Sequence, residues 1–181
     1  MKDLYGDIDR VLIDEKQIEA RTRELARQIE ADYKDTEDLL LICVLKGGYV
    51  FLSDLSRALA RPHDIDFMGV SSYGAGTQSS GAVQIIMDLK QPIAGRNVLI
   101  VEDIIDSGLT LNYLLKSLRV RRPESLEVAA LLVKEGIQRT PLDVKYTGFT
   151  IGPEFVIGYG LDYAGKFRNL PYVGVMDESS L

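Results

Sequence analysis

The chain has 181 residues, a formal net charge of −6, 46% hydrophobic residues and 27% charged residues. These values are typical of one globular domain that buries its own core, and they exclude fibrous and disordered classes. No apolar run reaches the roughly 18 residues that a membrane-spanning helix needs, so we expect no membrane partner. The acidic balance argues against a nucleic-acid partner, because such proteins usually present a basic surface.

The sequence contains a single cysteine, Cys43, which lies within an apolar run. It cannot form an internal disulfide, and its apolar setting predicts a buried, unreactive thiol. The first residues lack the apolar stretch of a secretory signal. Together these features predict a cytoplasmic protein.

In chain order, the first predicted element is an amphipathic helix that begins after Asp14. Asp14 and Gln17 form a capping-box pattern, in which each side chain can bond to the backbone N–H of the other residue. The helical spacing then places four residues on one face: Ile18, Thr22, Leu25 and Ile29. This face is expected to pack on the core.

The next segments predict a buried strand, a helix and a second strand. Residues 39–45 (LLLICVL) form a continuous apolar run, which is typical of a strand in a parallel sheet. The helix that follows carries Phe51, Leu52, Leu55 and Leu59 on its inner face. After a strand over 65–70, residues 71–82 (SSYGAGTQSSGA) are rich in serine and glycine and predict a flexible lid.

The second half alternates strands with one further helix. A buried strand over 97–101 is followed by Glu102 and Asp103, and a link over 104–110 leads into a helix with an apolar face. Other strands are predicted over 83–89, 126–133, 145–151 and 155–159. This order predicts an α/β fold, with a mostly parallel twisted sheet flanked by helices.

The most specific motif is VLIVEDIIDSGLT, residues 98–110. Ligands of open α/β sheets bind at the carboxyl ends of strands, so Glu102 and Asp103 are candidates to bind sugar hydroxyls or a divalent metal. Residues 106–110 can present backbone N–H groups to a phosphate at the start of the helix. The alternative is an ordinary helix cap, made by Asp106 or Ser107 after a plain strand.

This motif resembles the phosphoribosyl-pyrophosphate-binding signature of the type I phosphoribosyltransferases. Residues 44–55, Ser72-Tyr73, 131–134 and 155–175 resemble the hypoxanthine–guanine branch of that family, in the expected order. The resemblance covers about residues 5–176. It implies the type I phosphoribosyltransferase fold over a single domain, 1–181, with a small hood from the N-terminal and C-terminal segments and a lid at about 71–82.

The resemblance implies a role for each candidate site residue. Asp106 is implied to be the general base at N7 of a purine, and Lys134 the cation at its exocyclic O6. Phosphoribosyl pyrophosphate is implied to contact Lys46, Gly47, Glu102, Asp103, Asp106, Ser107, Gly108, Leu109, Thr110 and Arg168. The purine is implied to contact Lys134, Phe155, Val156 and Asp162. A magnesium ion, Mg²⁺, is implied at Asp162, Glu102 and Asp103, and the lid is implied to close through Ser72 and Tyr73.

Two details of the resemblance concern the backbone. Lys46-Gly47 matches a position where the family's peptide bond can be cis. Some members carry a lysine in the phosphate loop where this chain has Leu109. The affinity for the 5′-phosphate is therefore expected to differ, although backbone amides supply most of the binding.

The implied activity is magnesium-dependent transfer of the 5-phosphoribosyl group from phosphoribosyl pyrophosphate to N9 of a 6-oxopurine. The products are IMP or GMP and pyrophosphate, in purine salvage, and the family implies a homodimer or homotetramer. One alternative is an RNA-binding regulator of a pyrimidine operon on the same fold, which needs a basic face that the net charge of −6 does not favour. Another is an enzyme for xanthine, because Lys134 favours a 6-oxo group without ranking the bases.

Overall fold

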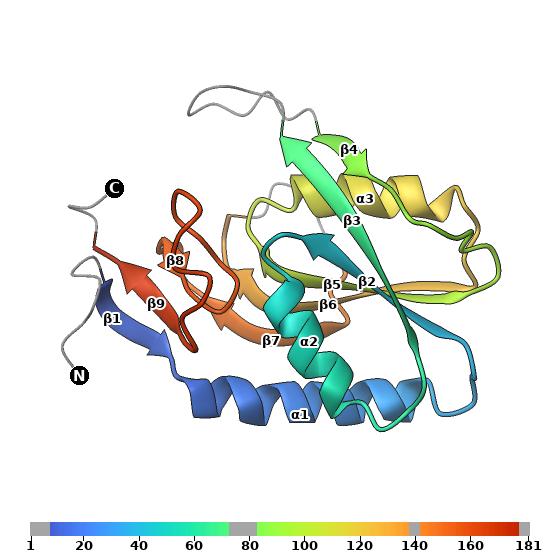
Figure 1. The fold of residues 1–181 in the computed structure, drawn as a ribbon, viewed down its shortest axis with the longest axis horizontal. Helices are drawn as coiled ribbons and strands as arrows, with labels where there is room; N and C mark the ends of the chain where they lie inside the picture. The colour runs from blue at the N-terminus through green and yellow to red at the C-terminus, as the bar shows by residue number, and fades with distance from the viewer. Residues whose placement is uncertain (1–7, 73–82, 138–141, 178–181) are drawn as a thin grey trace.

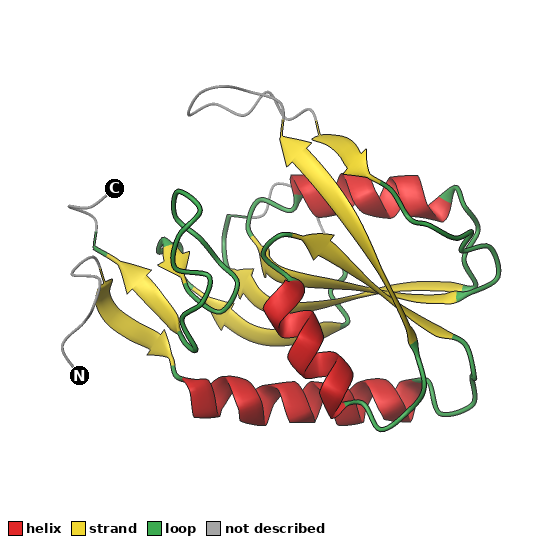
Figure 2. Ribbon diagram, in the orientation of Figure 1, coloured by secondary structure: helices red, strands yellow, loops and turns green. Residues whose placement is uncertain are grey.

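The computed structural model describes residues 8–72, 83–137 and 142–177 (Figure 1). Its larger sheet contains β2 (Leu39–Leu45), β3 (Asp64–Ser72), β4 (Val83–Met87), β5 (Asn97–Ile105), β6 (Ser125–Lys134) and β7 (Tyr146–Ile151). The strand order is β4-β3-β2-β5-β6-β7, and only β4 runs antiparallel to its neighbour. The predicted mostly parallel α/β sheet is confirmed (Figure 2).

Helices cover both faces of this sheet, as the alternation of side chains along β2 requires. Leu39, Leu41 and Cys43 share a core with α1 (Glu15–Asp32) and α2 (Tyr49–Ala58). The intervening residues of β2 share a second core with α3 (Leu109–Arg119). Cys43 is buried, as expected, and burial raises the pKa of its thiol to about 12. Within the described ranges, no helix combines the length and apolar character needed to cross a bilayer.

The first predicted helix, α1, begins with the expected capping box. The Gln17 N–H donates to Asp14 Oδ1 at 2.8 Å, and the Asp14 N–H donates to Gln17 Oε1 at 2.9 Å. The predicted inner face is buried: Ile18, Thr22, Leu25 and Ile29. The local sequence therefore determines both where α1 starts and which side of it meets the core.

A smaller sheet joins the two ends of the described chain. It contains β1 (Ile8–Ile13), β9 (Val173–Met176) and β8 (Val156–Ile157) in that order, all antiparallel. The sequence analysis predicted neither β1 nor β9. Each is short and becomes a strand through pairing with a segment distant in the chain, which local periodicity does not report.

The central strand β5 is longer than predicted. The expected strand ended at Val101 and left Glu102 and Asp103 beyond it, whereas β5 continues to Ile105. It does so because Ile104 and Ile105 pair with Leu132 and Val133 of β6. Both acids therefore lie on a paired strand and not in a loop.

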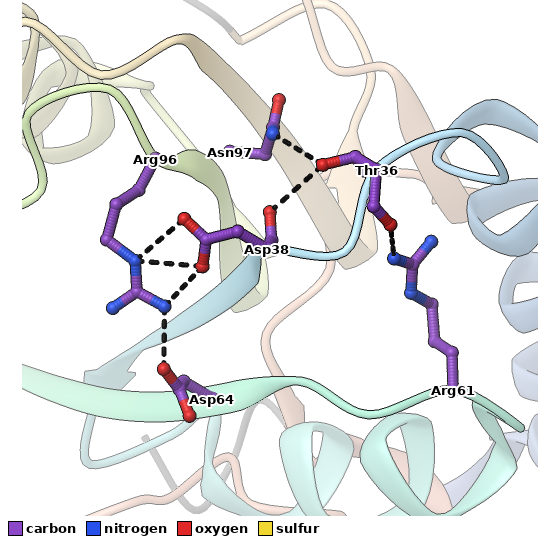
Figure 3. A network of polar contacts seen from close by, with 6 residues as sticks. All are labelled: Thr36, Asp38, Arg61, Asp64, Arg96 and Asn97. Atoms are coloured by element: carbon purple, nitrogen blue, oxygen red, sulfur yellow. Dashed lines mark hydrogen bonds and ion pairs between the residues drawn. The ribbon is translucent and has the colours of Figure 1, made fainter.

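At the opposite edge, a polar network connects the starts of neighbouring parallel strands (Figure 3). Arg96 precedes β5 and donates to both carboxylate oxygens of Asp38, which precedes β2, at 2.6 to 3.1 Å. The same guanidinium donates to Asp64 at the start of β3, at 2.6 Å. Asn97 donates to the Thr36 hydroxyl at 2.9 Å and accepts from Ser125 at the start of β6, at 2.8 Å. The network thus links the starts of β3, β2, β5 and β6.

Replacing Arg96 with alanine should lower the free energy of unfolding by about 1–2 kcal/mol, because a fork of charge-assisted hydrogen bonds is lost. Hydrogen bonds from Arg96 lower the pKa of Asp38. Their contribution is therefore complete above the unfolded pKa of about 3.9 and is lost as the pH falls through the folded pKa. Urea unfolding of the unmodified protein and of Arg96→Ala should give a difference in the free energy of unfolding that shrinks as the pH is lowered past about 4.

The matched control is Arg23→Ala, which removes an exposed ion pair to Glu19 on α1. Exposed pairs contribute about 0–1 kcal/mol, so this variant should change stability less than Arg96→Ala does. Equal losses in the two variants would contradict the role assigned to the network.

Candidate functional site

A cleft of about 230 Å³ opens at the carboxyl edge of the larger sheet, between the ends of β2 and β5 and the start of α3. It brings together seven of the predicted site residues: Gly47, Glu102, Asp103, Asp106, Ser107, Gly108 and Thr110. Lys46, Leu109, Lys134, Phe155, Val156, Asp162 and Arg168 are not among the residues that line it. Polar groups from the ends of two strands and from the start of a helix therefore converge here. The contacts of the other predicted site residues show where each of them lies.

The two acids of β5 stand in different surroundings. Glu102 is 7% exposed, and burial, followed by the charge of Asp103, raises its pKa well above the ordinary value. Burial also raises the pKa of Asp103 to about 6. Backbone N–H bonds and the charge of Arg168 oppose that rise, whereas the charge of Asp162 adds to it. The cleft thus contains two acids whose pKa values are raised chiefly by burial.

The turn after β2 lies directly against Asp103. A Cβ atom added to Gly47 would stand 1.6 Å from Asp103 Oδ2, so only glycine fits at this position. The cis peptide bond of this turn joins Leu45 and Lys46, one residue before the expected Lys46-Gly47 bond. The prediction of its place was therefore wrong, because the sequence marks the glycine turn without marking which peptide bond is cis.

The start of α3 presents backbone donors to the cleft. Gly108 is the N-cap residue, with φ of +76° and no side-chain cap, so the alternative of a helix cap by Asp106 or Ser107 is not observed. Ser107 Oγ lies 3.5 Å from the Leu109 N–H, which is a long contact. Among the described residues, no acceptor is found for the N–H groups of Thr110 and Leu111. These donors, at the positive end of the helix dipole, suit a phosphate.

Asp106 and Lys134 meet beside the cleft. Asp106 follows β5, Lys134 ends β6, and their side chains form an ion pair of 3.4 Å. Lys134 is only 8% exposed, so its ammonium lies in a setting where an unpaired charge would be costly. N7 and O6 of a 6-oxopurine lie within a few ångströms of each other, so a single purine can bond to both groups.

Asp162 and Arg168 lie together on the loop between β8 and β9. Arg168 forms an ion pair of 2.5 Å with Asp162 Oδ1 and donates to the Gly160 carbonyl at 2.6 Å. Asp162 Oδ2 accepts the Gly165 N–H at 2.8 Å. The charge of Arg168 lowers the pKa of Asp103, and the charge of Asp162 raises it.

Val156 begins β8 of the smaller sheet, and Phe155 immediately precedes it. Val156 is buried in β8, while Phe155 is 40% exposed and packs edge-on against Tyr163, with ring centroids 5.8 Å apart. Lys134 pairs with Ile151, four residues before Phe155. Part of the Phe155 ring is thus exposed, and Phe155 follows β7, the strand that pairs with the strand of Lys134.

The lid residues fall at the edge of what the structure describes. Ser71 and Ser72 belong to β3, where they pair with Gln84 and Val83 of β4. Tyr73 and the rest of the predicted lid, 74–82, lie outside the described residues.

The acids of the site fit a hard divalent cation in part. Among the described residues, no group of three or more metal-ligating side chains is found. The charge of Asp162 nevertheless raises the pKa of Asp103, so the two carboxylates lie close enough to repel. A cation near both would relieve that repulsion, and Mg²⁺ is typically bound by one or two carboxylates with waters and substrate oxygens.

Gly160 is a site element that the sequence analysis missed. A Cβ atom added to it would stand 2.1 Å from the Gly47 carbonyl oxygen. The loop with Asp162 and Arg168 therefore lies in backbone contact with the turn after β2. The GYG triplet at 158–160 is the only local signal of such a close approach.

Comparisons with known proteins agree with this fold. A family model described as a phosphoribosyl transferase domain matches residues 12–164. The hypoxanthine-guanine phosphoribosyltransferase of Mycobacterium avium is 50% identical, over 97% of this chain and 89% of the relative. That of Dictyostelium discoideum is 50% identical, over 93% of this chain and 95% of the relative.

The solved structures agree as well. A crystal structure of a hypoxanthine phosphoribosyltransferase from Staphylococcus aureus aligns with a TM-score of 0.93 at 41% identity, covering 99% of this chain and 98% of that one. The likeness confirms the expected type I phosphoribosyltransferase fold. The chain therefore belongs to the phosphoribosyltransferase family, in the group that contains the hypoxanthine-guanine phosphoribosyltransferases.

Proposed function

We propose that this enzyme transfers the 5-phosphoribosyl group from phosphoribosyl pyrophosphate to N9 of hypoxanthine or guanine, with Mg²⁺, in purine salvage. The observation that carries the proposal is the Asp106–Lys134 pair at 3.4 Å beside the uncapped start of α3. A proton acceptor and a cation for a 6-oxopurine then stand next to donors for a sugar phosphate. The proposal treats the chain as one domain with a hood, located in the cytoplasm and assembled as a homodimer or homotetramer.

The chain's own residues carry most of the chemistry in this proposal. N9 of the purine forms the bond to C1 of the ribose as the bond from C1 to pyrophosphate breaks, while Asp106 accepts the proton that the base loses at N7. Lys134 donates to O6, and Phe155 stacks on the ring next to the backbone of Val156. These groups act mainly by holding the reactants in line and by balancing charge.

The sugar and the leaving group are bound at the other side of the cleft. The N–H groups of residues 106–110 hold the 5′-phosphate, and Glu102 and Asp103 hold the ribose hydroxyls. Arg168 and the backbone at Lys46-Gly47 bind the pyrophosphate oxygens, and Ser72 and Tyr73 close over them. Asp162, with Asp103 or Glu102 and with waters and substrate oxygens, would hold Mg²⁺, which would neutralise charge on the leaving group.

The RNA-binding alternative is not favoured. The net charge is −6, and relatives at 50% identity are hypoxanthine-guanine phosphoribosyltransferases. In the described chain, the charged residues that line the cleft are all acids, which does not favour an RNA ligand there.

The first test measures turnover with phosphoribosyl pyrophosphate, Mg²⁺ and one base at a time: hypoxanthine, guanine, xanthine or adenine. Hypoxanthine and guanine should react, and adenine should not, because its 6-amino group presents a donor to the Lys134 ammonium. The rate with xanthine tests the alternative of an enzyme for xanthine. Turnover of adenine at the same rate as hypoxanthine would contradict the role of Lys134.

Asp106→Asn should lower kcat by about 10²–10³-fold, because an amide cannot accept the N7 proton. The KM values should change much less, since asparagine keeps the size of the side chain. Steady-state kinetics against both substrates measure this split. Asp35→Asn, an exposed position at the opposite end of the sheet, is the control and should keep the unmodified rate; unchanged turnover in Asp106→Asn removes that residue from the mechanism.

Binding of phosphoribosyl pyrophosphate with Mg²⁺ should weaken as the pH falls through about 6. The pKa of Asp103 is raised to about 6, so this carboxyl is ionised above that pH and becomes protonated below it. A protonated carboxyl loses most of its affinity for a cation. Calorimetric titrations from about pH 5 to 8 measure the dependence. Asp103→Asn should bind more weakly and with a shallower profile, because only the ligand's phosphate groups, with a second pKa of about 6, then titrate in this range. A profile of the same shape in that variant would assign the titration to another group.

A further inference from the structure

The loop between β8 and β9 holds its shape through an uncommon backbone. Gly158, Tyr159 and Gly160 have φ values of +93°, +50° and +99°. Tyrosine rarely adopts such a conformation, so contacts outside the residue must hold it there. Two backbone bonds close the loop, from the Tyr159 N–H to the Leu170 carbonyl and from the Gly160 N–H to the Arg168 carbonyl, each of 2.9 Å.

One side-chain contact ties this loop to a helix. The Tyr159 hydroxyl donates to Asp54 Oδ2 on α2 at 2.6 Å, although the two residues are 105 positions apart. Tyr159 is 6% exposed, and burial, followed by the bond to Asp54, raises its pKa. The hydroxyl therefore stays protonated at neutral pH and remains a donor to the carboxylate, which makes a strong charge-assisted bond.

The Tyr159–Asp54 hydrogen bond lies next to three groups in close contact, which are Gly160, the Gly47 carbonyl and the Asp103 carboxylate. Gly160 contacts the Gly47 carbonyl, and Gly47 contacts the carboxylate of Asp103, at distances that exclude a Cβ atom at either glycine. Arg168 donates to the Gly160 carbonyl and forms an ion pair with Asp162. A shift of Tyr159 would therefore move Gly160, and with it the two charged side chains that face Asp103.

We propose that Tyr159 and Asp54 are positioning residues for pyrophosphate: their hydrogen bond holds the 158–168 loop on the turn after β2, so that Arg168 and Asp162 meet the leaving group. Neither residue touches the reacting atoms. The inference rests on the proposed function, because it assigns pyrophosphate and its magnesium to the loop.

The test compares Tyr159→Phe, Asp54→Ala and Asp54→Asn with the unmodified protein. Hydrogen exchange, without Mg²⁺ or substrate, follows the amides of Tyr159, Gly160 and Leu161. Tyr159→Phe and Asp54→Ala should exchange about tenfold faster there, and should bind inorganic pyrophosphate with Mg²⁺ about 5–10-fold more weakly. Asp54→Asn keeps an acceptor oxygen but loses its charge, so it should fall between Asp54→Ala and the unmodified protein in both measurements. KM for phosphoribosyl pyrophosphate should rise with the loss of pyrophosphate affinity, while KM for the purine should not.

The matched control is Tyr146→Phe. Its hydroxyl donates to Asp32 at 2.8 Å, and its ring is buried at the opposite end of the sheet. This variant loses the same kind of bond and should leave pyrophosphate affinity and loop exchange unchanged. If Tyr159→Phe does not fold, the Asp54 pair carries the test, because Asp54 is partly exposed on the surface of α2.

Unchanged exchange at 159–161 in both Tyr159→Phe and Asp54→Ala would overturn the inference, as would faster exchange with unchanged pyrophosphate affinity. Equal weakening in Tyr146→Phe would also overturn it, because general destabilisation would then explain the effect. An unmodified protein that turns over no phosphoribosyl pyrophosphate contradicts the proposed function itself. An active protein whose variants bind pyrophosphate normally contradicts only the positioning role.

Discussion

The parallel pairing of β5 with β2 and β6 is the constraint on which the site depends. Parallel strands end at one edge, so the pairing brings the turn at Gly47, the acids of β5 and Lys134 to the same edge of the sheet. The opposite edge is closed by Arg96, which binds acids at the starts of β2 and β3. One edge of the sheet thus satisfies its charges internally, and the other leaves them available for a ligand.

The open edge combines groups that are unfavourable while no ligand is bound. Burial raises the pKa of Glu102 and of Asp103, and the start of α3 has no side-chain cap. Each feature costs stability in the free protein, since charges and N–H groups are best solvated or paired. A phosphorylated sugar with a divalent cation supplies the missing partners, so ligand binding should recover part of this cost. Lys134 is paired with Asp106 in the free protein because an unpaired ammonium in its buried position would be costly.

The loop after β8 reaches this edge from the far end of the chain. Its contacts with α2 and with the turn after β2 join residues more than a hundred positions apart. Gly158 and Gly160 permit this close approach, and the Tyr159 hydroxyl and Arg168 stabilise the loop. The geometry of Arg168 and Asp162 is therefore a property of the packed molecule and not of their own segment.

The sequence by itself determined the α/β class, the capping box at Asp14, the apolar core strands and the strand–acid–helix motif at 98–110. These features depend on periodicity and on neighbours close in the chain, which local patterns report directly. Only the tertiary structure decided that β5 extends to Ile105, that β1 and β9 are strands and that Gly160 meets Gly47. Only it placed the cis bond before Lys46 and joined Arg96 to Asp38. These are long-range pairings and close backbone contacts, and their energy comes from partners that no local window of the sequence contains.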